Sequence, residues 1–144
     1  MSTTAVSHLT TAQISGLTST QVKGLSSTFL NNLTTTAFSH LTTTQLSGLA
    51  ATQLTSLNTT QFTAMTTVQL GSLSTLQVKG LSTAALGTLT TTQLSGLTST
   101  QVGALATTQF ASLSTTIISN LSTIQLDGLT SSQLGRLTST QFQV

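Results

Sequence analysis

Hydrophobic residues recur along this chain with a period of eight. Octad 41–48 reads Leu-Thr-Thr-Thr-Gln-Leu-Ser-Gly, with apolar side chains at its first and sixth positions. When Leu41 is taken as position 1, the same frame divides all 144 residues into 18 octads of eight. Position 1 is Leu except at Met1 and Met65, and position 6 is apolar in every octad. The octad is therefore the structural unit of a repeat array.

Neither a continuous helix nor a continuous strand fits this pattern. An α-helix advances about 100° per residue, so the apolar stripe would drift by about 80° with each octad. In a strand, positions 1 and 6 would face opposite sides because they differ in parity. The chain must therefore change direction once per octad.

A short capped helix accounts for most of the octad. Position 2 is Ser, Thr or Asn in nearly every octad, and position 5 is Gln in thirteen of the eighteen. With position 2 as N-cap and position 5 as N3, these residues form a capping box, and positions 1 and 6 form a hydrophobic staple. Every Gly lies at position 7 or 8, where a permissive, solvent-facing backbone would end the helix. We predict an all-α solenoid with one capped helical turn per octad, in a single repeat domain, residues 1–144, with no separate capping domain.

Such short helices are unstable alone, so neighbouring octads must stack on one another. Phe38, Phe62 and Phe110 all stand at position 6 and are separated by multiples of three octads, which predicts three octads per coil. Val68, Leu76 and Ile124 replace the usual Thr at position 4. We expect these three side chains to face either the next coil or another molecule.

A β-solenoid is the alternative fold. Thr favours strands, and stacked coils could form Thr and Gln ladders. A strand over positions 1 to 5 would, however, point Leu, Thr and Gln inward and leave position 6 outside. A disordered Ser/Thr-rich tract is a further alternative, but it would have no reason to keep an apolar pair in register through every octad.

The composition excludes several functions. The charged side chains are Lys23, Lys79, Asp127 and Arg136, too few for a nucleic-acid surface. No apolar run is long enough to span a membrane. A single acid offers no carboxylate pair, and His8 and His40 have no third ligand at metal spacing. We therefore expect no enzyme activity, cofactor, metal or small-molecule substrate.

The pattern Leu-Thr-Thr-x-Gln, best seen in residues 9–17 (Leu-Thr-Thr-Ala-Gln-Ile-Ser-Gly-Leu), resembles octapeptide arrays of bacterial secreted and surface proteins. That resemblance implies a structural or adhesive role outside the cell, with no catalytic residues. Residues 1–8 lack the basic and apolar regions of a cleaved signal peptide. We therefore expect an extracellular or cell-surface location reached without such a peptide.

The first and last octads follow the same pattern as the others, whereas solenoids usually close with polar caps. We expect the chain to associate with itself, head to tail, into a filament or surface fibre. The residues predicted to mediate this assembly are Met1, Val6, Leu137, Phe142 and Val144. The alternative is a monomeric adhesive protein, or one that binds ice or another lattice through its rows of Thr.

Overall fold

The computed structural model describes residues 10–137, and all of the regular secondary structure in this part of the chain is helical. It contains 16 short α-helices, one per octad, and no strand. The all-α prediction is confirmed and the β-solenoid alternative is wrong. The helices are α2 (Thr11–Ser15), α3 (Ser19–Lys23), α4 (Ser27–Asn32), α5 (Thr35–Ser39), α6 (Thr43–Ser47), α7 (Ala51–Thr55), α8 (Thr59–Thr63), α9 (Thr67–Gly71), α10 (Thr75–Lys79), α11 (Thr83–Gly87), α12 (Thr91–Leu94), α13 (Ser99–Ala104), α14 (Thr107–Ala111), α15 (Thr115–Ser119), α16 (Thr123–Asp127) and α17 (Ser131–Leu134).

The predicted capping box starts most of these helices. In α6, the Thr42 hydroxyl accepts a 3.2 Å hydrogen bond from the Gln45 main-chain N–H. The Gln45 side-chain carbonyl accepts a 2.8 Å hydrogen bond from the main-chain N–H of Thr42. Two donors at the helix start are thus satisfied reciprocally. Where position 2 is Ala50, only the second half remains, because Ala50 N–H still donates to the side chain of Gln53.

The prediction that Gly ends each helix through its permissive backbone is wrong. Gly48 caps α6 at φ −74° and ψ −19°, an ordinary right-handed conformation. No residue of the described range, Gly included, has a positive φ. Any residue could adopt this backbone conformation. Gly at position 8 must therefore be explained by the atoms that this position contacts.

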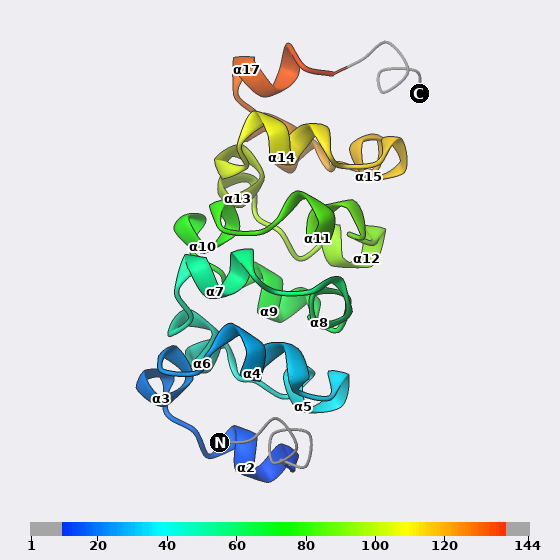
Figure 1. Cartoon of the computed structure of the whole chain (residues 1–144). Helices are drawn as coiled ribbons and strands as arrows, with labels where there is room; N and C mark the ends of the chain where they lie inside the picture. Colours follow the sequence, from blue (N-terminus) through cyan, green and yellow to red (C-terminus); the bar gives the residue numbers. More distant parts are fainter. Residues whose placement is uncertain (1–9, 138–144) are drawn as a thin grey trace.

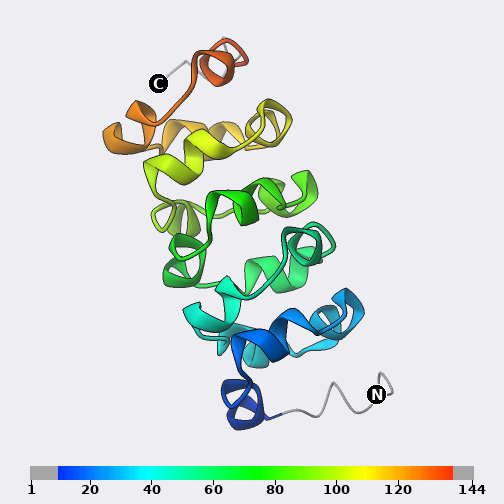
Figure 2. The ribbon, with the colours of Figure 1, turned by 90° about the vertical axis from the view of Figure 1, so that its left-hand side faces the viewer.

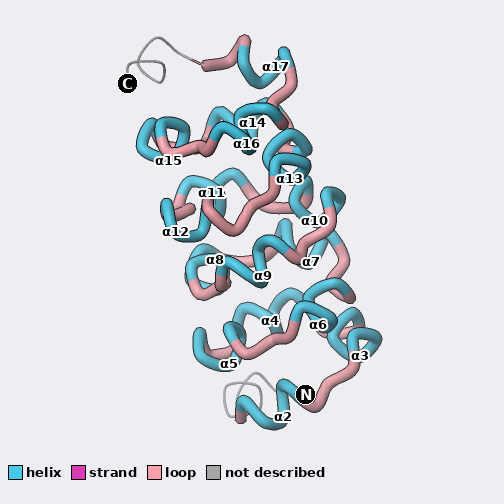
Figure 3. Tube along the Cα trace, turned by 180° about the vertical axis from the view of Figure 1, so that it is seen from behind, coloured by secondary structure: helices cyan, strands magenta, loops and turns pink. Residues whose placement is uncertain are grey.

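Three consecutive octads make one coil of the solenoid, as the Phe spacing predicts. Helices pack on the helix three octads away, as α3 does on α6, α7 on α10, and α10 on α13. The column of α5, α8, α11 and α14 holds the three Phe side chains at position 6. The coils rise along one axis from α2 to α17, which lie at opposite ends of the stack (Figure 1 and Figure 2). Viewed from behind, every coil alternates helix and short connection (Figure 3).

Positions 1 and 6 build one continuous core along the axis. Leu41 and Leu46, the predicted staple pair, both belong to it and are buried, as are Phe38, Phe62 and Phe110. Fully burying such a side chain contributes about 1.5–3 kcal/mol. The helices therefore depend on stacking, because a helix this short is not stable by itself.

Position 4 lies outside this core. Val68, Leu76 and Ile124 are 68–69% exposed, so the expectation that they face the next coil is wrong. As the second residue of its helix, position 4 points away from the axis whatever residue occupies it.

Candidate functional site

The surface between successive coils is held by the Gln at position 5. The Gln45 side-chain N–H2 group donates 2.7 Å hydrogen bonds to the main-chain carbonyls of Ile14 and Leu17, which stand 31 and 28 residues earlier. Its side-chain oxygen is engaged at the same time by the capping box. One amide thus starts its own helix and joins it to the preceding coil.

We call these residues the inter-coil glutamines. All of them are buried and donate to carbonyls 28 residues earlier: Gln45, Gln53, Gln61, Gln69, Gln77, Gln93, Gln101, Gln109, Gln125 and Gln133. Burying an amide is unfavourable unless its donors and acceptor are paired. Each of these bonds spans the same 28 residues, so the glutamines join successive coils in one constant register.

Glycine at position 8 lets the main chains of adjacent coils touch. A Cβ built on Gly48 would lie 2.4 Å from the carbonyl oxygen of Ser19, and one on Gly128 would lie 2.3 Å from that of Ser99. A Cβ on Gly16, at the same octad position, would meet nothing closer than 3.5 Å. Position 8 is thus more than the solvent-facing corner that the sequence predicts, because half-buried Gly48 and Gly128 set the distance between coils.

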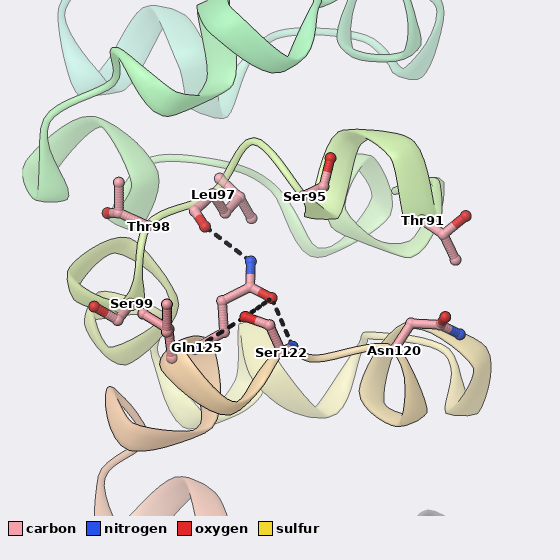
Figure 4. A pocket seen from close by; sticks show the side chains of 9 residues that line it. Thr91, Ser95, Leu97, Thr98, Ser99, Asn120, Ser122 and Gln125 are labelled. Atoms are coloured by element: carbon pink, nitrogen blue, oxygen red, sulfur yellow. Dashed lines mark hydrogen bonds between the residues drawn. The ribbon is translucent and has the colours of Figure 1, made fainter.

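A groove opens where position 8 is Asn120 instead of Gly. Asn120 stands 29 residues after Thr91, the separation between Gly48 and Ser19. The groove has a volume of about 580 Å³ and is lined by hydroxyl groups and the exposed Ile124, without a charged side chain. Thr91 and Asn120 lie on opposite walls, while Gln125 still joins the coils through the carbonyl of Leu97 (Figure 4). A smaller cavity of about 100 Å³ likewise adjoins position 8 at Arg136.

The two ends of the described stack present different chemistry. At one end, which we call the C-terminal layer (α16 and α17), the position-6 side chains Leu126 and Leu134 are 42% and 44% exposed. From Ile14 to Ile118 every position-6 side chain is only 0–6% exposed. The C-terminal layer therefore offers an apolar surface that the next coil covers elsewhere in the solenoid.

At the other end, the N-terminal layer (α2 and α3) offers amide donors. Gln13 and Gln21 are exposed, and their side-chain N–H2 groups have no acceptor among residues 10–137. Their side-chain oxygens are occupied by the capping boxes at Thr10 and Thr18. Ile14 and Val22 in the same layer are fully buried. The N-terminal layer is therefore polar where the C-terminal layer is apolar.

Four of the five predicted assembly residues, Met1, Val6, Phe142 and Val144, lie outside the described residues. The fifth, Leu137, is half-buried against the core. Sequence reasoning missed Leu126, Leu134, Gln13 and Gln21. The three-octad coil could have predicted these residues. An octad that has no partner three or four octads away must expose its position-5 amide or its position-6 apolar side chain.

The described residues bring no reactive groups together. Lys23, Lys79, Asp127, Arg136 and His40 are all exposed. No group of three or more His, Cys, Asp or Glu is close enough to hold a metal within residues 10–137. None of the helices in this range is long and apolar enough to cross a membrane. Apart from these scattered ionisable groups, the described surface consists of hydroxyls, amides and apolar side chains.

Comparison with known proteins supports the repeat nature of the chain. Residues 75–107, from α10 into α14, match the family model of the ALTTAQ repeat. The chain is a helical repeat protein. No curated protein and no solved structure matches it. The match covers only that segment, and the described octads outside it share with it the short helix per octad.

Proposed function

We propose that this repeat protein is a structural subunit that associates end to end into an extended filament or surface fibre, and that it has no catalytic activity. The observation that supports this most strongly is the exposure of Leu126 and Leu134, whose equivalents are covered by a further coil. Burying two half-exposed leucines contributes about 1–3 kcal/mol. Association also has an entropic cost of several kcal/mol, so we expect assembly to be reversible and to grow with concentration.

The two layers also support head-to-tail association in particular. Inside the described stack the Gln amides of one coil donate to main-chain carbonyls of the preceding coil. An N-terminal layer can therefore complement a C-terminal layer, whereas two N-terminal layers would set donor against donor. Contacts between unlike surfaces of identical subunits extend into open filaments unless they close into a ring. Electrostatic repulsion between neighbouring filaments would be weak, because the described surface carries so few ionised groups.

Sedimentation velocity from low to high micromolar concentration tests this proposal, with negative-stain electron microscopy of the same samples. We expect oligomers to grow with concentration and filaments to appear. The double variant Leu126→Glu/Leu134→Glu should remain monomeric, since it places charge on the C-terminal layer. Val68→Glu/Leu76→Glu is the matched control, because it adds the same charge at exposed apolar positions on the side of the stack. A wild-type protein that stays monomeric throughout would refute the proposal.

A second candidate function is recognition of an ordered lattice such as ice or a crystalline polysaccharide. Thr36, Thr60 and Thr108 at position 4 share one column of helices and are exposed. Their hydroxyls cap no helix and make no hydrogen bond within residues 10–137, unlike those at position 2. Thermal hysteresis of a monomeric solution tests the ice-binding form, and its absence would eliminate that form.

A further inference from the structure

The groove that Asn120 lines lies beside an octad that lacks both of the usual contacts with the preceding coil. In octad 41–48, Gln45 donates to carbonyls of the preceding coil, and Gly48 lets the two main chains touch. In octad 113–120 these two positions hold Ile117, which has no amide to donate, and the exposed Asn120. The groove, of about 580 Å³, is therefore a local departure from the repeat on the side of the stack.

Both walls of the groove carry polar side-chain groups that have no partner within residues 10–137. The hydroxyl groups of Thr91 and Ser99, on one coil, make no hydrogen bond with any residue of this range. On the next coil, the Asn120 side-chain amide donates 2.8 Å to the carbonyl of Thr116, which leaves its oxygen free to accept. The groove can therefore both donate hydrogen bonds to a ligand and accept them from it.

An apolar side chain lies among these polar groups. Thr stands at position 4 in most octads, but the groove has Ile124 there, and this side chain is 69% exposed. Leu97 lines the same groove from the opposite coil (Figure 4). A ligand that fits this surface must combine several hydrogen-bonding groups with an apolar face.

The groove also limits the charge of its ligand. No charged side chain lines it, so an ionised group would lose its hydration without gaining an opposite charge. Its volume falls within the range of about 300–1,000 Å³ that is usual for ligand sites. An extended peptide is commonly bound as an added strand at a sheet edge, and the walls here consist of short helices and turns without a strand.

We propose that this groove binds an uncharged oligosaccharide. The sugar hydroxyls exchange hydrogen bonds with Thr91 and Ser99 and donate to the side-chain oxygen of Asn120, while the C–H face of a ring packs on Ile124. Neither Leu126 nor Leu134 lines the groove, so binding does not depend on end-to-end association. In a fibre, each copy would contribute one such site.

Titration of the full chain with neutral hexasaccharides tests the proposal, with cellohexaose, maltohexaose and chitohexaose as the probes. We expect at least one of them to bind at millimolar concentration and to shift the side-chain amide resonances of Asn120 in nuclear magnetic resonance spectra. A hexamer of galacturonic acid, with a carboxylate on every ring, should bind at least about tenfold more weakly. If none of the three neutral sugars binds, the proposal is wrong.

The variant Thr91→Ala/Ser99→Ala tests the hydrogen bonds. Neither hydroxyl has a partner within residues 10–137, so the protein should fold normally, which circular dichroism checks. We expect sugar binding to weaken by at least about tenfold. The matched control Thr67→Ala/Thr75→Ala changes the same octad position one coil earlier, outside the groove, and should bind as wild type does.

The variant Ile124→Thr tests the apolar contact, because it restores the usual residue at position 4. It should also weaken binding, whereas Leu76→Thr, at an equally exposed position outside the groove, should not. If neither groove variant weakens binding, the sugar binds elsewhere and the proposed site is wrong. An uncharged hexapeptide of Gly, Ser and Val that binds the groove as tightly as the best sugar would contradict the proposed ligand class.

Assembly and sugar binding can fail separately. The Leu126→Glu/Leu134→Glu protein should bind the sugar as wild type does, although we expect it to remain monomeric. Sugar binding by a chain that never associates would refute the fibre and support the groove.

Discussion

The side-chain amide of Gln101 donates a 2.7 Å hydrogen bond to the main-chain carbonyl of Leu73, which stands 28 residues earlier and one coil below. The same amide donates to the carbonyl of Leu70, 31 residues earlier. Gln101 also accepts from the main-chain N–H of Thr98 at the start of α13. A single buried side chain therefore links the local capping of a helix to the stacking of coils.

Replacing this residue should destabilise the whole stack. Gln101→Ala leaves buried acceptors without a donor and opens a cavity, each a cost of about 1–3 kcal/mol. We expect the free energy of unfolding to fall by roughly 2–4 kcal/mol in urea titrations. Thr100→Ala is the control, because its exposed position-4 side chain should change stability by less than about 0.5 kcal/mol. Equal effects of the two substitutions would contradict a role for the amide in stacking.

Glycine at position 8 should be required only where coils touch. Gly128→Ala places a Cβ 2.3 Å from the carbonyl oxygen of Ser99, so the coils must separate. We expect a loss of about 1–3 kcal/mol in thermal or urea unfolding. Gly16→Ala has the same right-handed backbone and no such contact. It should be neutral or stabilise by about 0.4–1 kcal/mol, since Ala restricts the unfolded chain. If both substitutions destabilise alike, close approach is not the reason for Gly.

One inter-coil glutamine is incompletely paired, and correcting it should stabilise the protein. Asn58 N–H donates a 2.9 Å hydrogen bond to the side chain of Asn31, and the side-chain oxygen of Gln61 is left buried without a partner. The double variant Asn31→Ser/Asn58→Thr restores the usual capping box and should raise the free energy of unfolding by about 1 kcal/mol. Asn58→Thr alone should gain less, because Asn31 still competes for the N–H. No gain in the double variant would show that the orphaned oxygen has no energetic cost.

The local structure could be predicted from the sequence because its signals are local. Thr42 and Gln45 are three residues apart, and the capping box follows from that spacing alone. The number of octads per coil came from the Phe column, a longer-range but still visible repeat. The second hydrogen-bonding role of Gln45 could not be predicted, because it depends on which carbonyls the coil below presents. The same holds for Gly48, whose small size is required by Ser19 of another coil.

The candidate assembly site differs from the fold, because most of the residues predicted for it lie outside residues 10–137. The prediction that uncapped ends expose apolar groups led to residues such as Val6 and Phe142 that lie outside the described range. Among the described residues, the exposed position-6 pair is Leu126 and Leu134. Position 6 is covered by a later coil from Ile14 to Ile118, and its exposure rises at Leu126. Which position-6 side chains are exposed depends on which octads stack on one another, and this cannot be predicted from the sequence of a single octad.

The stacking of octads in threes is most directly tested by engineered disulfides in this cysteine-free chain. A Cβ on Gly48 would lie 3.0 Å from the Cβ of Ser19, close enough for a disulfide after a small shift of the coils. Gly48→Cys is combined in turn with Ser19→Cys, Ser27→Cys or Thr11→Cys, which correspond to coils of three, two and four octads. After mild oxidation of dilute protein, we expect a cross-link within one chain only for the Ser19→Cys pair. Efficient cross-linking of either other pair, with none at Ser19, would contradict the three-octad coil.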